Sequence, residues 1–303
     1  MRWLAKAALQ RVLGGLPRGE RLNYVFQRRV LRSFPVGDAA LRQKFTRALT
    51  HLGAYEEHGP GVPLAEATFF EFGAGWDLAI PISYALLGLG HHVLVDIRPS
   101  ARVELVNETI AAYERLRPEL EEQAGRSLGE LGGPVASIAE LEPRFGIRYL
   151  APCDARDTGL PAESVDLVTS TDTCEHIPAA DLAAIFAECR RLLRSGGAFT
   201  CRIDLQDHYS YFDRSISRYH FLRFSDPAWA LVNSPLHFQN RLRAPEYLRL
   251  VREAGFDLIA ERPSGPSEEG REELRTLRLA ERFRDFSEDD LGVTVLSFVA
   301  RPT

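Results

Sequence analysis

The sequence predicts one α/β domain. Its core is expected to be a doubly wound, seven-stranded sheet, mostly parallel with an antiparallel last strand, preceded by an N-terminal helical cap. Three observations favour this fold class. From residue 66 to residue 303, short apolar segments alternate with helix-like segments, as in βαβ units. The first apolar segment opens into the glycine turn Gly73-Ala74-Gly75. The last two strands are joined without a full crossover helix, which predicts antiparallel pairing.

Residues 1–65 precede the first strand and are predicted to form the helical cap. Apolar residues recur at helical spacing over 3–12, and further helices are expected at 22–31 and 38–52, the last with Asp38 as N-cap. Residues 1–50 hold eleven Arg and Lys against two acids, so this segment carries about +9 and the remainder about −14. The pattern suits a cap over the sheet and also peripheral contact of basic helices with an anionic membrane surface.

The remaining elements are predicted from apolar runs and from glycine and proline positions. Strands are expected at 68–73, 91–96, 147–151, 165–170, 198–203, 256–261 and 293–300. Helices are expected at 77–88, about 100–117, 179–194, 244–254 and about 268–283. Segment 118–146 is polar and is predicted to be an insertion of helix and loop. The helix over 179–194 is expected to end in a glycine C-cap at Gly196 and Gly197.

Composition excludes several classes of protein. Hydrophobic residues make up 45% and charged residues 26%, as in an ordinary globular protein. No apolar run approaches the roughly 20 residues that span a bilayer, and no secretory signal pattern is present, so a cytoplasmic location is expected. The four cysteines form no C-x-x-C pair. They are predicted to be small buried residues rather than a disulfide or zinc framework.

The segment around the first glycine turn predicts a ligand site. Glu71 ends an apolar strand, Gly73-Ala74-Gly75 follows, and a helix comes next, which lets the backbone approach a ligand closely. Asp96 ends the second strand, where a carboxylate is placed to take a ribose diol. Asp77 is expected to be the N-cap of the following helix. Leu78 stands where a dinucleotide fingerprint requires glycine or alanine.

Taken together, the landmarks from residue 67 to 303 resemble those of class I S-adenosylmethionine-dependent methyltransferases, which have a Rossmann-like sheet. The landmarks are Glu71 to Gly75, Asp96, Cys153-Asp154-Ala155, 165–170 with Glu175-His176, and the glycine turn at 192–197. The resemblance implies that S-adenosylmethionine is the cofactor. Glu71, Gly73, Ala74 and Gly75 would lie at its methionine part, Asp96 at the ribose, Asp154 and Ala155 at the adenine, and Asp172 would face it.

Two histidines are candidates for the base that takes a proton from the acceptor. His176 follows the fourth strand and His208 follows the fifth, at the edge where the methyl group would point. Histidine, with an ordinary pKa near 6.5, suits proton transfer near neutrality. His208 is the preferred base, with Asp204 or Asp207 as its orienting partner.

A divalent metal ion is an alternative to a simple base, although no ligand set is assigned. Asp172-x-x-Glu175-His176, with His208 further on, has the ligand types and spacing for Mg²⁺ or another divalent ion. It is similar to metal-assisted methyltransferases with an E-x-x-E-H motif and a later histidine. In this sequence the first acid is Asp.

Segment 204–243 is predicted to cover the acceptor, because aromatic residues and arginines alternate along it. The expected acceptor is a small molecule or saccharide, methylated at a hydroxyl oxygen. One alternative is a nucleic-acid methyltransferase, which is disfavoured because no Asn-Pro-Pro-aromatic motif follows the fourth strand. A second is an NAD-dependent oxidoreductase, which Leu78 disfavours. A third is a non-catalytic S-adenosylmethionine-binding protein. The sequence makes no prediction about the oligomeric state.

Overall fold

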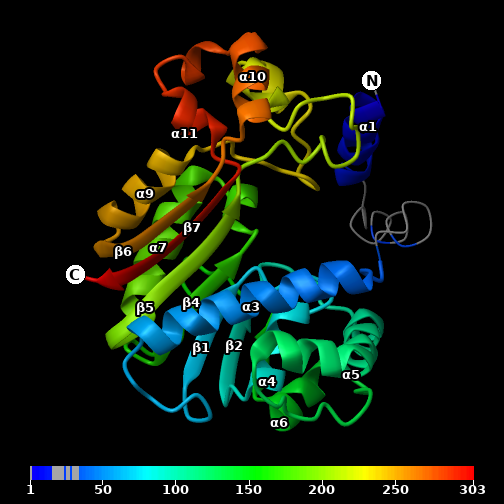
Figure 1. Ribbon diagram of the computed structural model, residues 1–303, viewed down its shortest axis with the longest axis vertical. Helices are drawn as coiled ribbons and strands as arrows, with labels where there is room; N and C mark the ends of the chain where they lie inside the picture. Colours follow the sequence, from blue (N-terminus) through cyan, green and yellow to red (C-terminus); the bar gives the residue numbers. More distant parts are fainter. Residues whose placement is uncertain (1, 16–23, 25–27, 29–33) are drawn as a thin grey trace.

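The fold is a seven-stranded sheet with the strand order β3-β2-β1-β4-β5-β7-β6 (Figure 1). The computed structural model describes residues 2–15, 24, 28 and 34–303. Strands β1 to β5 pair in parallel, and β7 pairs antiparallel with both β5 and β6, as the sequence predicts. The strands are β1 (Thr68–Phe72), β2 (His91–Val95), β3 (Ile147–Leu150), β4 (Val165–Thr171), β5 (Leu193–Asp204), β6 (Phe256–Ser264) and β7 (Val295–Pro302).

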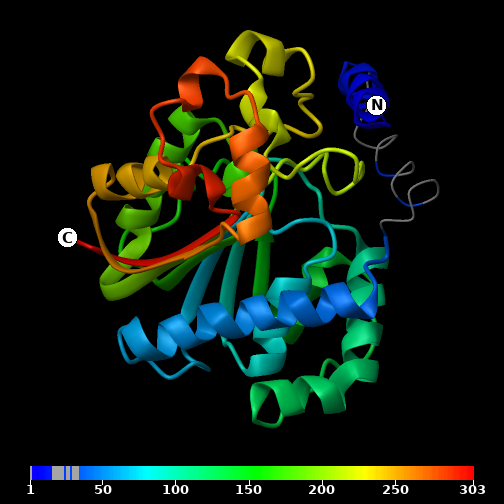
Figure 2. The same ribbon diagram turned by 45° about the horizontal axis from the view of Figure 1, so that its top comes forward.

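Helices cover both faces of the sheet and its upper end (Figures 1 and 2). They are α1 (Arg2–Gly14), α3 (Asp38–His58), α4 (Ala79–Leu87), α5 (Val103–Ala124), α6 (Leu141–Phe145), α7 (Ala179–Leu192), α8 (Asp226–Ala230), α9 (Ala244–Glu253), α10 (Glu268–Thr276) and α11 (Glu288–Gly292). No described helix is long and apolar enough to cross a membrane. The membrane contact predicted for the basic N-terminal helices stays a prediction.

Two apolar cores lie on opposite faces of the sheet because side chains alternate along each strand. Phe69 packs into the core under α3, α4 and α5, whereas Phe70 packs into the core under α7 and α9. A third apolar cluster joins α1 to the segments above the sheet through Trp3, Tyr209 and Trp229. The N-terminal helices therefore divide their roles: α3 packs on the sheet and α1 packs on the segment that follows β5.

Several predicted element ends are wrong. The N-cap of α3 is Gly37, and Asp38 is its first residue. Helix α5 continues through Pro118 to Ala124, with buried leucines on both sides of the proline that hold it against the core. Strand β5 begins at Leu193 and includes the glycine pair that was expected to be a helix C-cap.

Two further predictions concern helices. The helix expected over 268–283 ends at Thr276, and a separate 3₁₀ turn covers Glu281–Phe283. Between them, the Ala280 N–H donates to the Leu222 carbonyl at 2.9 Å and draws the chain towards the segment after β5. The helix predicted at 22–31 lies almost wholly outside the described residues.

A buried arginine anchors the segment after β5. Arg243 is fully buried, and its guanidinium donates to the carbonyls of Leu205 at 2.8 Å, Leu291 at 2.8 Å and Val293 at 2.5 Å. Burial lowers the pKa of Arg243 to about 10, so the group remains charged at neutral pH. One side chain thus ties the start of segment 204–243 to the chain just before β7.

Replacing this anchor should destabilise the fold. Arg243→Met keeps the apolar stem but leaves three buried carbonyls without a donor, each costing about 1–3 kcal/mol. We expect a loss of roughly 3 kcal/mol or more in the free energy of unfolding, measured by urea denaturation. Arg249→Met is the matched control on α9, where an exposed ion pair with Glu253 is worth about 0.5 kcal/mol or less. Equal, small losses in both variants would contradict the anchoring role.

Candidate functional site

The predicted ligand residues meet at the carboxyl ends of the strands. Strand order reverses between β1 and β4, the place where open α/β sheets bind ligands. A cavity of about 300 Å³ opens there. Its wall includes Gly73, Asp96, Asp154, Ala155 and His176. A second cavity of about 270 Å³ lies on the other side of the glycine loop and is lined by residues that include Glu71, Ala74, Gly75 and Asp172.

The glycine loop borders both cavities, because Gly73 lines each of them. Gly73 has a φ of +80°, and a Cβ there would lie 2.2 Å from Thr173 Cγ2, so any side chain would collide with the turn after β4. Gly75 has a φ of +77°, and a Cβ there would meet nothing within 4 Å. The first glycine therefore permits close packing of two loops, while the second borders open space. This backbone fits a cofactor lying along the loop.

The loops after β2 and β3 are joined at the cavity wall. The Cys153 N–H donates to the Asp96 carbonyl at 2.9 Å, so the predicted ribose and adenine residues belong to one connected wall. Asp154 is held by Arg156 at 2.6 Å, and the same arginine contacts Asp181 at 2.7 Å. Hydrogen bonds from Arg156 lower the pKa of the Asp154 carboxyl, which is therefore ionised at neutral pH.

Glu71 is buried beside His92 beneath the glycine loop. Its Oε2 lies 3.4 Å from His92 Nε2 and accepts from Thr169 Oγ1 at 3.3 Å. Burial raises the pKa of Glu71 to about 8 and lowers the pKa of His92 to about 3. Both groups are thus mainly neutral near pH 7, and Glu71 presents a protonated carboxyl to the floor of the cavity.

The prediction that Asp77 is the N-cap of α4 is wrong by one residue. The assigned N-cap of α4 is Leu78, whose φ is 48°. Asp77 Oδ1 nonetheless accepts from the Ala79 N–H at 3.1 Å, and Oδ2 lies 2.6 Å from Lys44 Nζ on α3. The carboxylate therefore supports the helix start, and Lys44 ties this start to α3.

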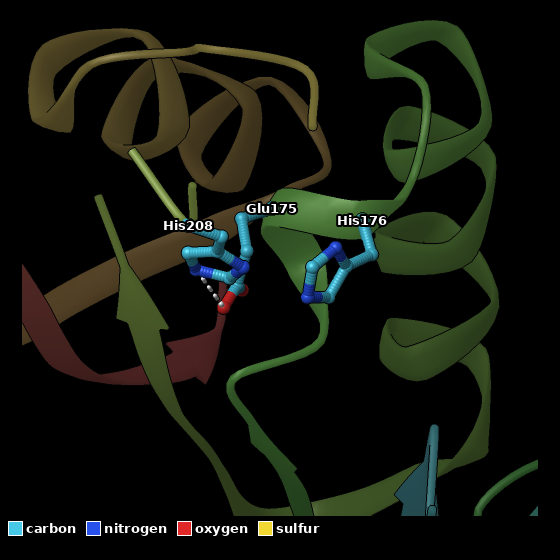
Figure 3. Close-up of side chains that lie close together, drawn as sticks. All are labelled: Glu175, His176 and His208. Carbon is cyan, nitrogen blue, oxygen red and sulfur yellow. Dashed lines mark ion pairs between the residues drawn. The ribbon is translucent and has the colours of Figure 1, made fainter. Parts of the chain in front are cut away.

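A second group of predicted residues meets beyond the loop, after β4 and β5 (Figure 3). Glu175 and His176 lie in the 3₁₀ turn Cys174–His176, and His208 comes from the segment after β5. One ligand atom from each of these three side chains lies within 4.8 Å of the others. His176 also lines the 300 Å³ cavity, so the cluster adjoins the predicted cofactor site.

The partner of His208 is Asp204. His208 Nε2 lies 3.4 Å from Asp204 Oδ2 and 4.0 Å from Glu175 Oε1. The alternative partner, Asp207, instead lies 3.3 Å from His220 Nδ1. Burial opposes ionisation of Asp204, but its contacts with His208 and Tyr211 lower its pKa to about 2. A carboxylate that stays ionised is therefore in place beside the imidazole.

Glu175 is the unusual member of the cluster. It is buried, and neither of its carboxylate oxygens has a hydrogen-bond partner among the described residues. Burial, followed by the nearby charge of Asp172, raises its pKa well above the ordinary value. His176 Nδ1 lies 2.7 Å from the Phe238 carbonyl, to which it donates, so Nε2 keeps its lone pair.

Asp172 lies outside this ligand set. Its carboxylate is held by Arg47 at 2.5 Å and by a second close ion pair with Arg202. Sequence reasoning missed these two arginines as site residues. The Trp76 ring, which follows the glycine loop, stacks on Phe34 with 5.3 Å between ring centroids and lines the 270 Å³ cavity. No local signal separates Arg47 from the other basic residues of α3, since its role depends on a contact with a distant turn.

One family model matches part of the chain. The family model described as a methyltransferase domain matches residues 135–201, the stretch from before β3 to within β5. Over this stretch the chain is similar to a methyltransferase domain. The strand order with its antiparallel β7 is the one that the sequence predicts for a Rossmann-like methyltransferase sheet.

The chain is also similar to solved structures, at low sequence identity and with TM-scores just under 0.5. Geranyl diphosphate C-methyltransferase from Streptomyces coelicolor A3(2) is 15% identical with a TM-score of 0.48, covering 86% of this chain and 80% of that one. A geranyl diphosphate methyltransferase solved with S-adenosylmethionine is 18% identical with a TM-score of 0.49, covering 89% and 93%. A Pyrococcus horikoshii OT3 protein is 14% identical with a TM-score of 0.48, covering 92% and 98%. No curated protein sequence matches the chain.

The buried Glu71 should make stability depend on pH. Its pKa of about 8 lies above the ordinary 4.5, so between these values the folded protein holds a proton that the unfolded chain has released. Stability therefore falls as pH rises through this window. Glu71→Gln has no carboxyl to titrate at this position. The wild type should therefore lose several kcal/mol of unfolding free energy relative to Glu71→Gln as the pH rises from 5 to 8.

The measurement is urea denaturation at several pH values. Glu66→Gln is the control, because Glu66 is exposed and close in sequence. A constant difference between Glu71→Gln and the wild type across the whole range would contradict a protonated Glu71.

Proposed function

We propose that the enzyme transfers the methyl group of S-adenosylmethionine to a hydroxyl oxygen of a small-molecule or saccharide acceptor, with His208 as general base. The observation that carries the proposal is the His208–Asp204 pair at 3.4 Å, located where β4 and β5 end and beside the cavity that His176 lines. Methyl transfer to oxygen needs alignment of donor and acceptor and removal of one proton. The pair supplies the second requirement.

The two cavities around the glycine loop support a donor site. In the proposal, the backbone of Gly73, Ala74 and Gly75, with Glu71 beneath, lies along the methionine part of the cofactor. Asp96 accepts from the ribose hydroxyls, and Asp154 with the Ala155 N–H contacts the adenine. When bound, the cofactor supplies an electrophilic methyl group on a sulfonium. Because this group is already activated, the protein's own task is placement.

The acceptor side follows from the charges around His208. Asp204, ionised because its pKa is about 2, stabilises the imidazolium that forms when His208 takes the acceptor proton. The Tyr211 hydroxyl donates to the same carboxylate and holds it in place. Segment 204–243, which carries His208 and Tyr211, would cover the acceptor.

Loss of Asp96 should weaken cofactor binding. We expect Asp96→Ala to raise the Kd for S-adenosylhomocysteine at least about tenfold in calorimetric titration, because charge-assisted hydrogen bonds to the ribose are lost. Asp157→Ala is the matched control, since Asp157 is exposed and lies outside the cavity lining. NAD should give no binding signal. Binding of NAD in preference to S-adenosylhomocysteine would contradict the donor assignment.

A specific observation favours a second candidate mechanism, in which a divalent ion activates the acceptor. Glu175 has two buried oxygens without hydrogen-bond partners among the described residues, and His176 has its Nδ1 proton directed to a carbonyl, as ligating histidines do. Two imidazoles and one carboxylate suit Zn²⁺, Mn²⁺ or Fe²⁺ better than Mg²⁺. In this candidate His208 is a ligand, and the ion lowers the pKa of the acceptor hydroxyl.

His208→Gln should lower methyl transfer about 100-fold or more in both mechanisms while leaving S-adenosylhomocysteine binding intact. The assay is labelled-methyl transfer to a panel of sugars and phenols, with His91→Gln, an exposed site, as control. Metal analysis, chelation and Glu175→Gln separate the two candidates. Under the base mechanism, chelated enzyme and Glu175→Gln stay active. Loss of activity in both, with metal present in the wild type, would replace the base mechanism with the metal one.

A further inference from the structure

A polar cavity of about 410 Å³ lies between α3 and the β5–β7 part of the sheet. Its volume is within the range of small-molecule sites. Apart from Cys201, every lining residue has a polar side chain, and none is Asp or Glu among the described residues: Gln43, Thr46, Arg47, Thr50, His51, Thr200, Arg202 and Ser297. The donor functions described above do not use this cavity.

Two arginines, Arg47 and Arg202, are the charged side chains that line the cavity among the described residues. Arg47 and Arg202 both contact the carboxylate of Asp172, so two guanidinium groups share one negative charge. Their side chains are only 27% and 22% exposed. A guanidinium stays protonated and offers five N–H donors, so one carboxylate cannot satisfy both. An anion at the cavity wall would accept from the N–H groups that Asp172 leaves unused.

The neighbouring histidine, His51, adds no positive charge to the cavity. His51 is buried, with Nδ1 3.1 Å from Thr200 Oγ1 and Nε2 2.9 Å from Thr171 Oγ1. Burial, followed by the positive charges of Arg202 and Arg47, lowers its pKa to about 3. The ring is therefore neutral at physiological pH, and the positive charge of the cavity comes from the arginines alone.

We propose that this cavity binds the oxyanion group, a carboxylate or phosphate, of a hydroxylated small molecule, and that this molecule is the methyl acceptor. The planar guanidinium fork matches either oxyanion. The hydroxyl and amide groups of Thr50, Ser297 and Gln43 on the same wall suit the hydroxyls of a sugar-like body. The acceptor role rests on the methyl transfer proposed above, whereas anion binding does not.

The position of the arginines relates this cavity to the reaction site. Arg47 also lines the 270 Å³ cavity at the glycine loop, so a bound oxyanion would lie beside the donor. Arg202 lies on β5, and the proposed base His208 with its partner Asp204 comes from the end of the same strand and the segment after it. An anionic acceptor held by the arginines would therefore be within reach of both donor and base.

The test is calorimetric titration of the full-length protein saturated with S-adenosylhomocysteine. Glucose 6-phosphate and glucuronate represent the two oxyanions, and glucose is the neutral probe. At least one of the anions should bind about tenfold or more tightly than glucose. Arg202→Gln should abolish this preference, since Arg202 lines the anion cavity but not the donor cavities. Arg42→Gln, on the same helix and paired with exposed Glu119, should change nothing.

Three outcomes would overturn the proposal: no binding of either anion, equal binding of anion and glucose, or unchanged anion affinity in Arg202→Gln. Arg202→Lys guards against misfolding, since it keeps the charge but not the fork and should retain only part of the preference. Binding of S-adenosylhomocysteine is measured for every variant. If the wild type did not bind S-adenosylhomocysteine, the methyl-transfer function would be contradicted. If it bound S-adenosylhomocysteine but no anion, only the assignment of the anion cavity would be contradicted.

Discussion

The parallel pairing of β1 with β4 is the constraint on which the candidate functional site depends. Phe69 pairs with Leu167 and Glu71 with Thr169, although about 98 residues separate the two strands in the sequence. This register brings the glycine loop that follows β1 against the turn that follows β4. The two loops can approach this closely because residue 73 is glycine. A Cβ at this position would collide with Thr173. Without this pairing, the loop and the cluster of Glu175, His176 and His208 would not share an edge.

Helix α3 completes the site from the other side. Lys44 contacts Asp77 at the start of α4, and one helical turn later Arg47 contacts Asp172 after β4. His51, a further turn along, forms hydrogen bonds to threonines of β4 and β5. Residues on one face of a helix recur every three to four positions, so a single helix serves three loops or strands. Two of the basic residues of the N-terminal segment, Lys44 and Arg47, therefore line the cavities.

The fold was largely predictable, because each strand and helix after residue 66 has a local apolar pattern and most of the turns contain glycine or proline. The errors came where tertiary contacts override local signals. Pro118 ends a helix by local rules, but Leu116 and Leu120 pack in the core on either side of it and the helix continues. Gly196 and Gly197 are typical of a helix C-cap, yet pairing with β4 from Leu193 onward makes them part of β5.

The sequence by itself determined the α/β class, the glycine loop from Glu71 to Gly75, and the positions of the histidines after β4 and β5. These features depend on residue type and on spacing along the chain. Only the tertiary structure decided that Asp204 rather than Asp207 faces His208, and that Asp172 pairs with Arg47 and Arg202 instead of joining Glu175. The reason is physical. A charged side chain takes its partner by distance in space, and Arg47 reaches Asp172 only after α3 has packed across the sheet.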